Sequence, residues 1–289
     1  MIINHQKQLG RCLYLSLLLA LYFTLTACST TQVHYRNFDL PDSTLISGYL
    51  SKPDGDGPFP AVVLLHGCAG LGLDTAYKVD FKNLQQYQVA LREAGFVSLI
   101  VDTYGSRGMS TDQLWTTSCG GKDKPERHID LSGAIHYLKK LSYVKPKIGA
   151  VGQSQGGRMA IVASGWEERP NRKQLLTAAV AVYPSCILRR PSVVRIPLLI
   201  LIGDADLITP AEHCQNWVDA YERELGDELD ENGQPVGMVP EIVIYPGVYH
   251  EYDLTGSGGV SPLGDAVPNR KAAKDTKDRI IAFFREHLR

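Results

Sequence analysis

The sequence has no excess of charge of either sign. Its 30 Lys and Arg residues are balanced by 31 Asp and Glu residues, so the formal net charge is −1. Proteins that hold nucleic acid by its phosphates carry a basic surface, and this balance argues against that class of partner. The chain also lacks internal repeats, coiled-coil heptads and low-complexity tracts, which argues against solenoid and fibrous architectures.

Metal-binding spacings are missing as well. The cysteines and histidines form neither a CxxC nor an HxxxH unit, which are spacings that hold zinc in many proteins. We therefore expect no metal site and no other cofactor.

An apolar run long enough to cross a membrane comfortably is also absent. Leu13 to Thr26 is apolar but short, follows a basic start and ends at Ala27-Cys28, which predicts a signal peptide over residues 1–27. The stretch Leu25-Thr26-Ala27-Cys28 resembles a bacterial lipobox. The resemblance implies cleavage before Cys28, lipid attachment to its thiol and, because Ser29 follows, an outer-membrane anchor facing the periplasm. The alternatives are an uncleaved anchor or an ordinary signal peptide, and each of them also exports the folded part.

The rest of the chain predicts one domain. Removal of residues 1–27 leaves 262 residues, which suits a single domain with a large core. We expect a polar tether over residues 28–37 and an α/β domain over residues 38–289. Buried-strand patterns alternate there with helical patterns, which predicts a mostly parallel sheet with helices on both faces. The strands are expected at 38–40, 45–50, 61–65, 96–101, from 148 to the turn at 152, and at 178–183, 198–202 and 241–245; the helices are expected at 82–94, 127–141, 157–164, 210–225 and 272–287.

One strand leads into Gly152-Gln153-Ser154-Gln155-Gly156, the pattern of a nucleophile elbow. A serine at a sharp strand-to-helix turn leaves its neighbours little room for a Cβ atom, which explains the flanking glycines. The helix behind such a turn favours developing negative charge at its N-terminus. The alternative is a glycine-rich turn without chemistry.

Polar residues follow other strands of the predicted sheet at the edge where α/β proteins bind ligands. A serine nucleophile needs a histidine base and an orienting acid, which α/β-hydrolases supply in the chain order Ser, Asp, His. Ser154, Asp206 and His250 occur in that order, each just after a predicted strand. Asp204 is the rival acid. Glu251 and Asp253 are expected to be solvated.

Four further residues are candidates for a supporting role. The backbone N–H groups of Gln155 and Cys68 are expected to bind the oxyanion of a tetrahedral intermediate. Tyr104 and Arg107 follow another strand and are candidates for binding a substrate carboxylate. The alternative for Arg107 is a salt bridge within its loop.

Cysteine usage fits an oxidising compartment. Apart from Cys12 and Cys28, four cysteines remain, and an even number in an exported protein indicates two disulfides. Three pairings are possible. We favour Cys68–Cys119 and Cys186–Cys214, because the two loops of each pair should meet at one end of the sheet.

These motifs together resemble the dienelactone hydrolase family of the α/β-hydrolases. The matching segments are His66 to Gly70, Gly105 to Gly108, Gly152 to Gly157, Tyr183 to Cys186, Gly203 to Asp206 and Tyr245 to His250. The resemblance implies an α/β-hydrolase fold and places the acid and base of the family on Asp206 and His250. The founding enzymes use a cysteine nucleophile, where this chain has Ser154, and carry a first-loop glutamate, where this chain has Gly67.

The departures from the family pattern weaken the case for a dienelactone substrate. We expect an exported serine hydrolase that cleaves small-molecule carboxylic esters or lactones through an acyl-enzyme. One alternative is a peptidase or amidase that uses the same triad. Another is a lipid-anchored envelope protein whose site is catalytically silent.

Overall fold

The computed structural model describes residues 30–37, 43–74, 79–117, 119, 127–165, 175–188, 193–225, 229, 232–233, 236–254, 260–261, 264–265 and 267–289. The predicted signal peptide, Cys28 and the predicted strand at 38–40 lie outside these residues. The chain divides into two units, Met1–Thr31 and Gln32–Arg289, and the second is the unit described below. Among the described helices, none has the length and apolar character needed to cross a membrane.

A sheet of eight strands forms the centre of the part that the structure describes, and its strand order is β1-β2-β4-β3-β5-β6-β7-β8. Strand β2 is antiparallel to β4, whereas the pairs from β4 through β3, β5, β6 and β7 to β8 are all parallel. The sheet is therefore mostly parallel, as predicted. The strands are β1 (Thr31–Arg36), β2 (Leu45–Ser51), β3 (Phe59–Leu65), β4 (Val97–Asp102), β5 (Val144–Gln153), β6 (Ala178–Val182), β7 (Leu198–Gly203) and β8 (Glu241–Tyr245).

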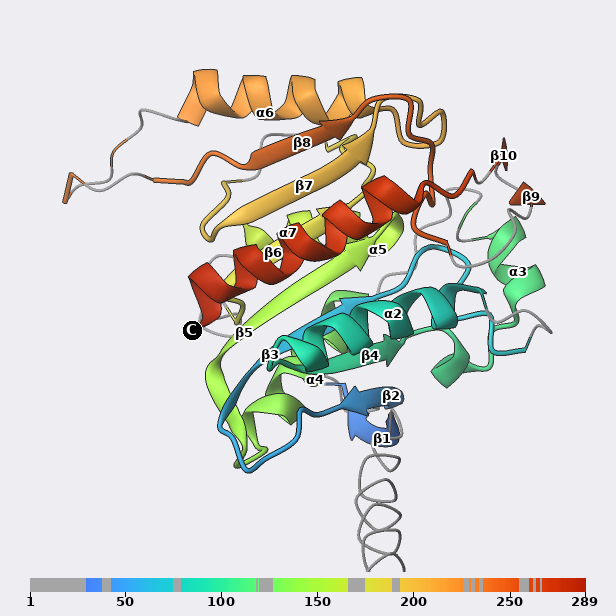
Figure 1. The fold of residues 1–289 in the computed structure, drawn as a ribbon, viewed down its shortest axis with the longest axis vertical. Coiled ribbons are helices and arrows are strands. Elements are labelled where there is room, and N and C mark those ends of the chain that lie inside the picture. Colours follow the sequence, from blue (N-terminus) through green and yellow to red (C-terminus); the bar gives the residue numbers. More distant parts are fainter. Residues whose placement is uncertain are drawn as a thin grey trace, which may run out of the picture. The chain divides into compact units, whose positions relative to one another are not determined.

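Helices cover both faces of this sheet. Figure 1 shows α2 and α7 crossing one face, with α4 and α5 on the opposite face. The helices are α2 (Val79–Glu93), α3 (Thr111–Thr116), α4 (Arg127–Lys139), α5 (Gln155–Ser164), α6 (Ala211–Leu225) and α7 (Arg270–Leu288). A 3-10 turn η1 (Gly105–Arg107) and two short strands, β9 (Val260–Ser261) and β10 (Gly264–Asp265), complete the described elements.

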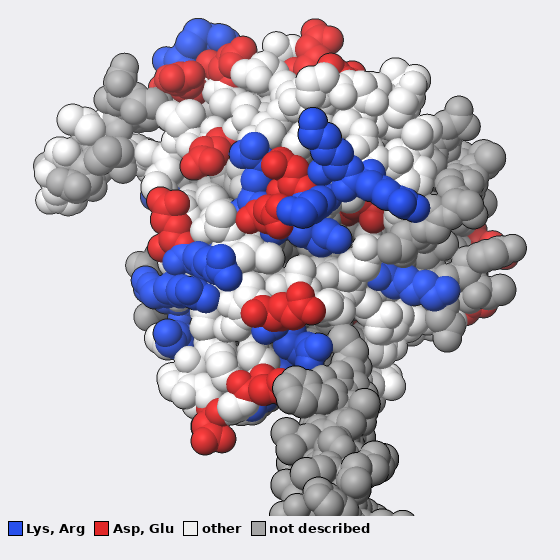
Figure 2. Space-filling model, in the orientation of Figure 1, with Lys and Arg blue, Asp and Glu red and all other residues white. Residues whose placement is uncertain are grey.

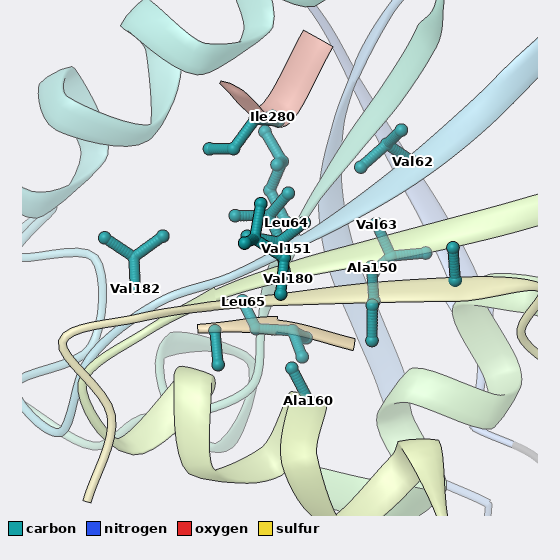
Figure 3. Close-up of a cluster of buried hydrophobic side chains, with 14 of the residues drawn as sticks. Val62, Val63, Leu64, Leu65, Ala150, Val151, Ala160, Val180, Val182 and Ile280 are labelled. Atoms are coloured by element: carbon teal, nitrogen blue, oxygen red, sulfur yellow. The ribbon is translucent and has the colours of Figure 1, made fainter. Parts of the chain in front are cut away.

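The central strands are apolar because both of their faces are covered. Every residue of β4, β6 and β7 is buried. Figure 3 shows Val62 to Leu65 of β3 beside Ala150 and Val151 of β5, with Ile280 of α7 above the sheet and Ala160 of α5 below it. The continuous apolar runs in the sequence thus correspond to strands buried between two helical layers.

The structure differs from the sequence-based expectation at the start of the domain. Residues 31–36, expected to be part of a tether, form the edge strand β1 beside β2. Tyr35 is buried there against Tyr137, with a ring-centroid distance of 5.5 Å. One buried aromatic side chain is enough to dock this short segment, but it is too weak a pattern to predict a strand. Helix α3 and turn η1 were not predicted either.

The carboxyl ends of the parallel strands lie at one edge of the sheet. Figure 1 shows the arrowheads of β4, β5, β7 and β8 pointing the same way. On the face drawn in Figure 2, basic and acidic side chains are interspersed, in keeping with the balanced composition. The fold therefore collects the loops after its strands at one place, and the candidate site lies there.

Candidate active site

Ser154 stands at the turn between β5 and α5 in a strained backbone conformation. Its φ of 51° and ψ of −115° lie in a region of backbone conformation that residues other than glycine rarely adopt. The neighbouring backbone is correspondingly close. A Cβ atom on Gly152 would lie 2.0 Å from the carbonyl oxygen of Gly156, and one on Gly156 would lie 2.4 Å from the carbonyl oxygen of Leu65. Both glycines are required by this turn, which presents the Ser154 hydroxyl at the edge of the sheet.

A continuous hydrogen-bonded chain joins Ser154, His250 and Asp206. The Ser154 Oγ lies 3.1 Å from His250 Nε2, and His250 Nδ1 lies 2.6 Å from Asp206 Oδ2. The three side chains come from the turns after β5, β8 and β7, and all three residues are buried. With the proton on Nδ1, the imidazole donates to Asp206 and accepts from Ser154. This arrangement can withdraw the hydroxyl proton as the oxygen attacks a carbon atom.

Asp206 is fixed in place by its own turn. Its Oδ1 accepts from the N–H groups of Ile208 and Thr209 at 2.9 and 2.8 Å, and its Oδ2 also accepts from the Thr209 hydroxyl at 2.8 Å. Asp204 instead accepts from the N–H of Gly247 at 2.6 Å and closes a turn. The structure therefore brings Asp206, and not Asp204, to the histidine. Thr209 was not predicted as a site residue; the sequence signal for it is an aspartate in a loop, whose side chain often bonds the backbone of its own turn.

The loop after β3 lies against the nucleophile turn. A Cβ atom on Gly67 would lie 3.7 Å from the Ser154 Cβ. Cys68, whose N–H is a predicted oxyanion donor, follows directly. Gln155, the other predicted donor, is the first residue of α5 and directly follows Ser154. Both predicted donors thus belong to segments that contact Ser154.

Tyr104 and Arg107 are held inside the protein by other partners. The Tyr104 ring is buried and its hydroxyl donates to Gln155 Oε1 at 2.7 Å. Arg107 pairs with buried Asp130 through both Nη atoms, at 2.8 and 2.9 Å, and donates to the carbonyl of Thr103 at 2.6 Å. Arg107 therefore forms a salt bridge, but with Asp130 of α4 and not within its own loop as the alternative had it. Its guanidinium is engaged by this carboxylate, which disfavours a role in binding a substrate carboxylate.

Asp253, which was expected to be solvated, is instead a buried carboxylate three residues after His250. Asp253 is 5% exposed and accepts four hydrogen bonds. Its Oδ1 accepts from Asn83 at 3.1 Å and Tyr183 at 2.9 Å, and its Oδ2 accepts from Gln153 at 2.8 Å and from Tyr87. Burial, followed by the charge of Asp253, raises the pKa of both tyrosines well above the ordinary value, so both phenols keep the proton that they donate.

Glu251 was also expected to be solvated, and the structure corrects that expectation too. It is only partly exposed and adopts a φ of 53°. Burial raises the pKa of its carboxyl group above the ordinary value, with a smaller opposing effect from His250. Tyr183 also has a positive φ, of 38°. Its ring packs edge-on against the His250 ring, with a centroid distance of 4.8 Å. Strained backbone therefore occurs on three sides of the candidate site.

Both favoured disulfides are present in the structure. Cys68 is bonded to Cys119, and Cys186 is bonded to Cys214. The first ties the loop after β3 to the segment that follows α3, and the second ties the loop after β6 to α6. Within the described part of the chain, no three His, Cys, Asp or Glu side chains are grouped so that they could hold a metal ion.

An eight-stranded, mostly parallel sheet with a strained serine turn and a Ser–His–Asp chain at its carboxyl edge defines an α/β-hydrolase. The sequence profile of the dienelactone hydrolase family matches residues 46–288. The chain therefore belongs to the dienelactone hydrolase family. No curated protein matches its sequence.

Solved structures share this fold at low sequence identity. A dienelactone hydrolase from Anabaena variabilis is 17% identical with a TM-score of 0.61, and the match covers 90% of this chain and 99% of that one. An esterase from Pyrococcus furiosus is 17% identical with a TM-score of 0.59, over 90% and 94% of the two chains. An acylaminoacyl peptidase from Pyrococcus horikoshii is 16% identical with a TM-score of 0.57, over 93% of this chain and 43% of that one. At this identity the similarity establishes the fold alone.

Proposed function

We propose that this protein is an exported serine hydrolase that cleaves small-molecule carboxylic esters or lactones, with Ser154 as nucleophile, His250 as base and Asp206 as orienting acid. The observation that carries the proposal is the unbroken hydrogen-bond chain from Ser154 Oγ through His250 to Asp206. The strained backbone of Ser154 supports it, because strain of this kind persists where the surrounding structure enforces it for a function.

The proposed reaction has two halves. Ser154 Oγ attacks the ester carbonyl carbon while its proton passes to His250 Nε2, and the N–H groups of Gln155 and Cys68 bind the oxyanion. Collapse of the tetrahedral intermediate breaks the bond to the alcohol, which leaves with the proton from His250. Water then attacks the acyl-serine with His250 as base, which releases the acid and restores the serine.

Labelling with a fluorophosphonate probe, together with p-nitrophenyl ester hydrolysis, tests the assignment. We expect Ser154→Ala to abolish labelling and to lower turnover roughly 10⁶-fold, as in other triads. Labelling that persists in Ser154→Ala would contradict the assignment of Ser154 as the nucleophile of the triad. A folded parent protein that is neither labelled nor active would favour the silent envelope protein instead.

Turnover of esters and of the matched anilides separates an esterase from an amidase or peptidase. An amide has a poorer leaving group, so we expect the ester to be hydrolysed far faster. Equal or faster anilide turnover would support the amidase alternative, a class that includes a protein of this fold, the Pyrococcus horikoshii acylaminoacyl peptidase.

The proposed location of the protein is the periplasmic side of the outer membrane, to which a lipid on Cys28 would anchor it. The lipobox-like sequence before Cys28 supports it, and two disulfides suit an oxidising compartment. Radiolabelled palmitate should be incorporated into the full chain expressed in a Gram-negative host and should be absent from Cys28→Ala. Incorporation that survives this substitution would contradict the anchor.

A further inference from the structure

Arg127 is a buried cation in a position that disfavours one. It is 6% exposed and is the first residue of α4, where the positive end of the helix dipole opposes a positive side chain. Among the residues that the structure describes, no carboxylate forms an ion pair with it, and its Nε is buried without a hydrogen-bond partner. A buried charge without a counter-charge lowers stability unless hydrogen bonds compensate for the lost hydration.

Three of the four hydrogen bonds of the Arg127 side chain lead to the two predicted oxyanion donors. Nη1 donates to the carbonyl of Gly67 at 3.2 Å and to Gln155 Oε1 at 2.9 Å, and Nη2 donates to the carbonyl of His66 at 2.5 Å. The fourth is a longer bond from Nη1 to the Tyr104 hydroxyl at 3.4 Å, and the guanidinium carbon lies 5.3 Å from the centre of the Tyr104 ring. The Gly67 carbonyl belongs to the same peptide group as the N–H of Cys68. One guanidinium group thus contacts the peptide that carries the first donor and the side chain of the residue that carries the second.

The Gly67 carbonyl also accepts from His66 Nδ1 at 2.7 Å. Burial, and then the charge of Arg127, lower the pKa of His66 well below its ordinary value, so this imidazole is neutral and the loop gains no second positive charge. Two donors on one carbonyl polarise its peptide group, and a polarised peptide N–H is a stronger hydrogen-bond donor. The positive charge acts in a buried environment, where electrostatic interactions are screened less than in water.

We propose that Arg127 is a positioning residue that aligns and polarises the two oxyanion donors, Cys68 N–H and Gln155 N–H. The inference rests on the proposed serine hydrolase function and adds to it a buried cation that acts through other groups without touching the substrate. It accounts for a charge that the fold itself does not pair.

The test compares three purified full-length variants with the parent protein: Arg127→Gln, Arg127→Lys and Arg158→Gln. Arg158 is the matched control. It is an arginine on α5 that donates to the carbonyl of Ile187 at 2.5 Å, but it is partly exposed, so solvent screens its charge. For p-nitrophenyl ester hydrolysis we expect Arg127→Gln to lower kcat about 10- to 100-fold with KM changed less than about threefold, since an oxyanion interaction forms mainly in the transition state.

Arg127→Lys should recover part of this loss, because lysine keeps the charge but not the planar fork. Arg158→Gln should stay within about twofold of the parent, because an exposed charge contributes little. Equal losses in Arg127→Gln and Arg127→Lys, or a loss confined to KM, would contradict a role in aligning and polarising the donors.

A boronic acid inhibitor supplies a readout that simple loosening of the loop would not produce. Its adduct with a serine is tetrahedral and anionic, so its Ki in Arg127→Gln should rise by about the factor by which kcat/KM falls. An unchanged Ki beside a lowered kcat would overturn the proposal. If circular dichroism shows that Arg127→Gln is unfolded, Arg127→Lys tests the proposal in its place. We then expect kcat of Arg127→Lys to fall about three- to tenfold, with a matching rise in Ki. Values of kcat and Ki equal to those of the parent protein would overturn the proposal.

Failure of the proposed function would look different from failure of this inference. A folded parent protein without ester hydrolysis or fluorophosphonate labelling would reject the serine hydrolase, and the inference with it. An active parent and an inactive Ser154→Ala, beside an Arg127→Gln that equals the parent in kcat and Ki, would reject the role of Arg127 alone.

Discussion

Two buried charges flank Ser154, and the protein holds them in opposite ways. Gln153, which precedes the serine, donates to the carboxylate of Asp253, whereas Gln155, which follows it, accepts from the guanidinium of Arg127. Asp253 accepts four hydrogen bonds, two on each oxygen. Arg127 has an unpartnered buried Nε and lies at the unfavourable end of a helix. Both oxygens of the anion therefore have two donors each, whereas one of the three nitrogens of the cation has no partner.

We infer from this difference that Asp253 serves the fold and that Arg127 serves the proposed reaction. The donors to Asp253 come from α2, from the end of β5 and from the residue after β6, so one carboxylate joins three elements to the loop that carries His250. Its removal should loosen all of them. Arg127 contacts chiefly the loop and the residue that are predicted to bind the oxyanion, so its removal should affect catalysis more than folding.

The largest expected effect on stability is that of Asp253→Asn. Either orientation of the new amide places an NH₂ group opposite two groups that now donate, so the cluster loses hydrogen bonds and gains buried donors without acceptors. We expect the free energy of unfolding to fall by about 3 kcal/mol, as measured by urea denaturation at pH 7.5.

Asp275→Asn is the matched control for this change. Asp275 is an exposed carboxylate that also accepts from a tyrosine hydroxyl and an arginine, and we expect its substitution to cost less than about 0.5 kcal/mol. If Asp253→Asn cost no more than this control, the view of Asp253 as a structural anion would be wrong.

The fold was predictable because its signals are local. Strands β3 to β8 and helices α2 and α4 to α7 were predicted within a few residues of their observed bounds, since apolar runs and helical periodicity are visible in short windows. Strand β1 was missed because it is short, largely exposed and fixed by one buried tyrosine. The chain order of Ser154, Asp206 and His250, each after a strand, likewise needed no knowledge of distant contacts.

The residues that surround the candidate triad were not predictable in this way. A buried charge has no local signature, because its partners lie far along the chain: Asn83 donates to Asp253 across 170 positions, and Arg127 reaches the carbonyl of His66 across 61. Near His250, the pattern of acidic residues suggested a solvated loop. Only the tertiary structure shows that Asp253 turns inward and that Arg107 is occupied by Asp130.

A third buried charge, that of Asp102, sharpens the comparison. Asp102 ends β4 and lines a cavity of about 340 Å³ between the loops that follow β3 and β4. Burial raises the pKa of its carboxyl from 3.8 to about 6, against an opposing hydrogen bond from the N–H of Gly105 at 2.9 Å. The hydrogen bond from Gly105 is thus too little to offset the burial of this carboxylate.

Asp102→Asn should therefore stabilise the protein at neutral pH. Because the folded-state pKa is raised, the ionised carboxylate destabilises the fold in full above about pH 6. The destabilisation falls as the pH drops from about 6 to 4 and disappears at lower pH, where the carboxyl is protonated in both states. The difference between a pKa of 3.8 and one of about 6 sets a ceiling of about 3 kcal/mol, and we expect a gain of about 2 kcal/mol at pH 7.5. Thermal unfolding of both proteins at pH 7.5 and pH 4 measures it. A gain of equal size at both pH values would show that ionisation is not its cause.

Of the two charges that flank Ser154, Arg127 should contribute less to stability, and Arg127→Gln tests this distinction most directly. The substitution removes hydrogen bonds to two carbonyls, to Gln155 and to the Tyr104 hydroxyl, but it also relieves a buried charge and an unfavourable interaction with the start of α4. These effects oppose each other, so we expect the free energy of unfolding to fall by only about 1 kcal/mol in urea, well under the loss for Asp253→Asn. A loss as large as that of Asp253→Asn would mean that the cation is as much a part of the fold as the anion. A small loss of stability beside a large loss of kcat would instead show that this charge is retained at the expense of stability because the oxyanion donors depend on it.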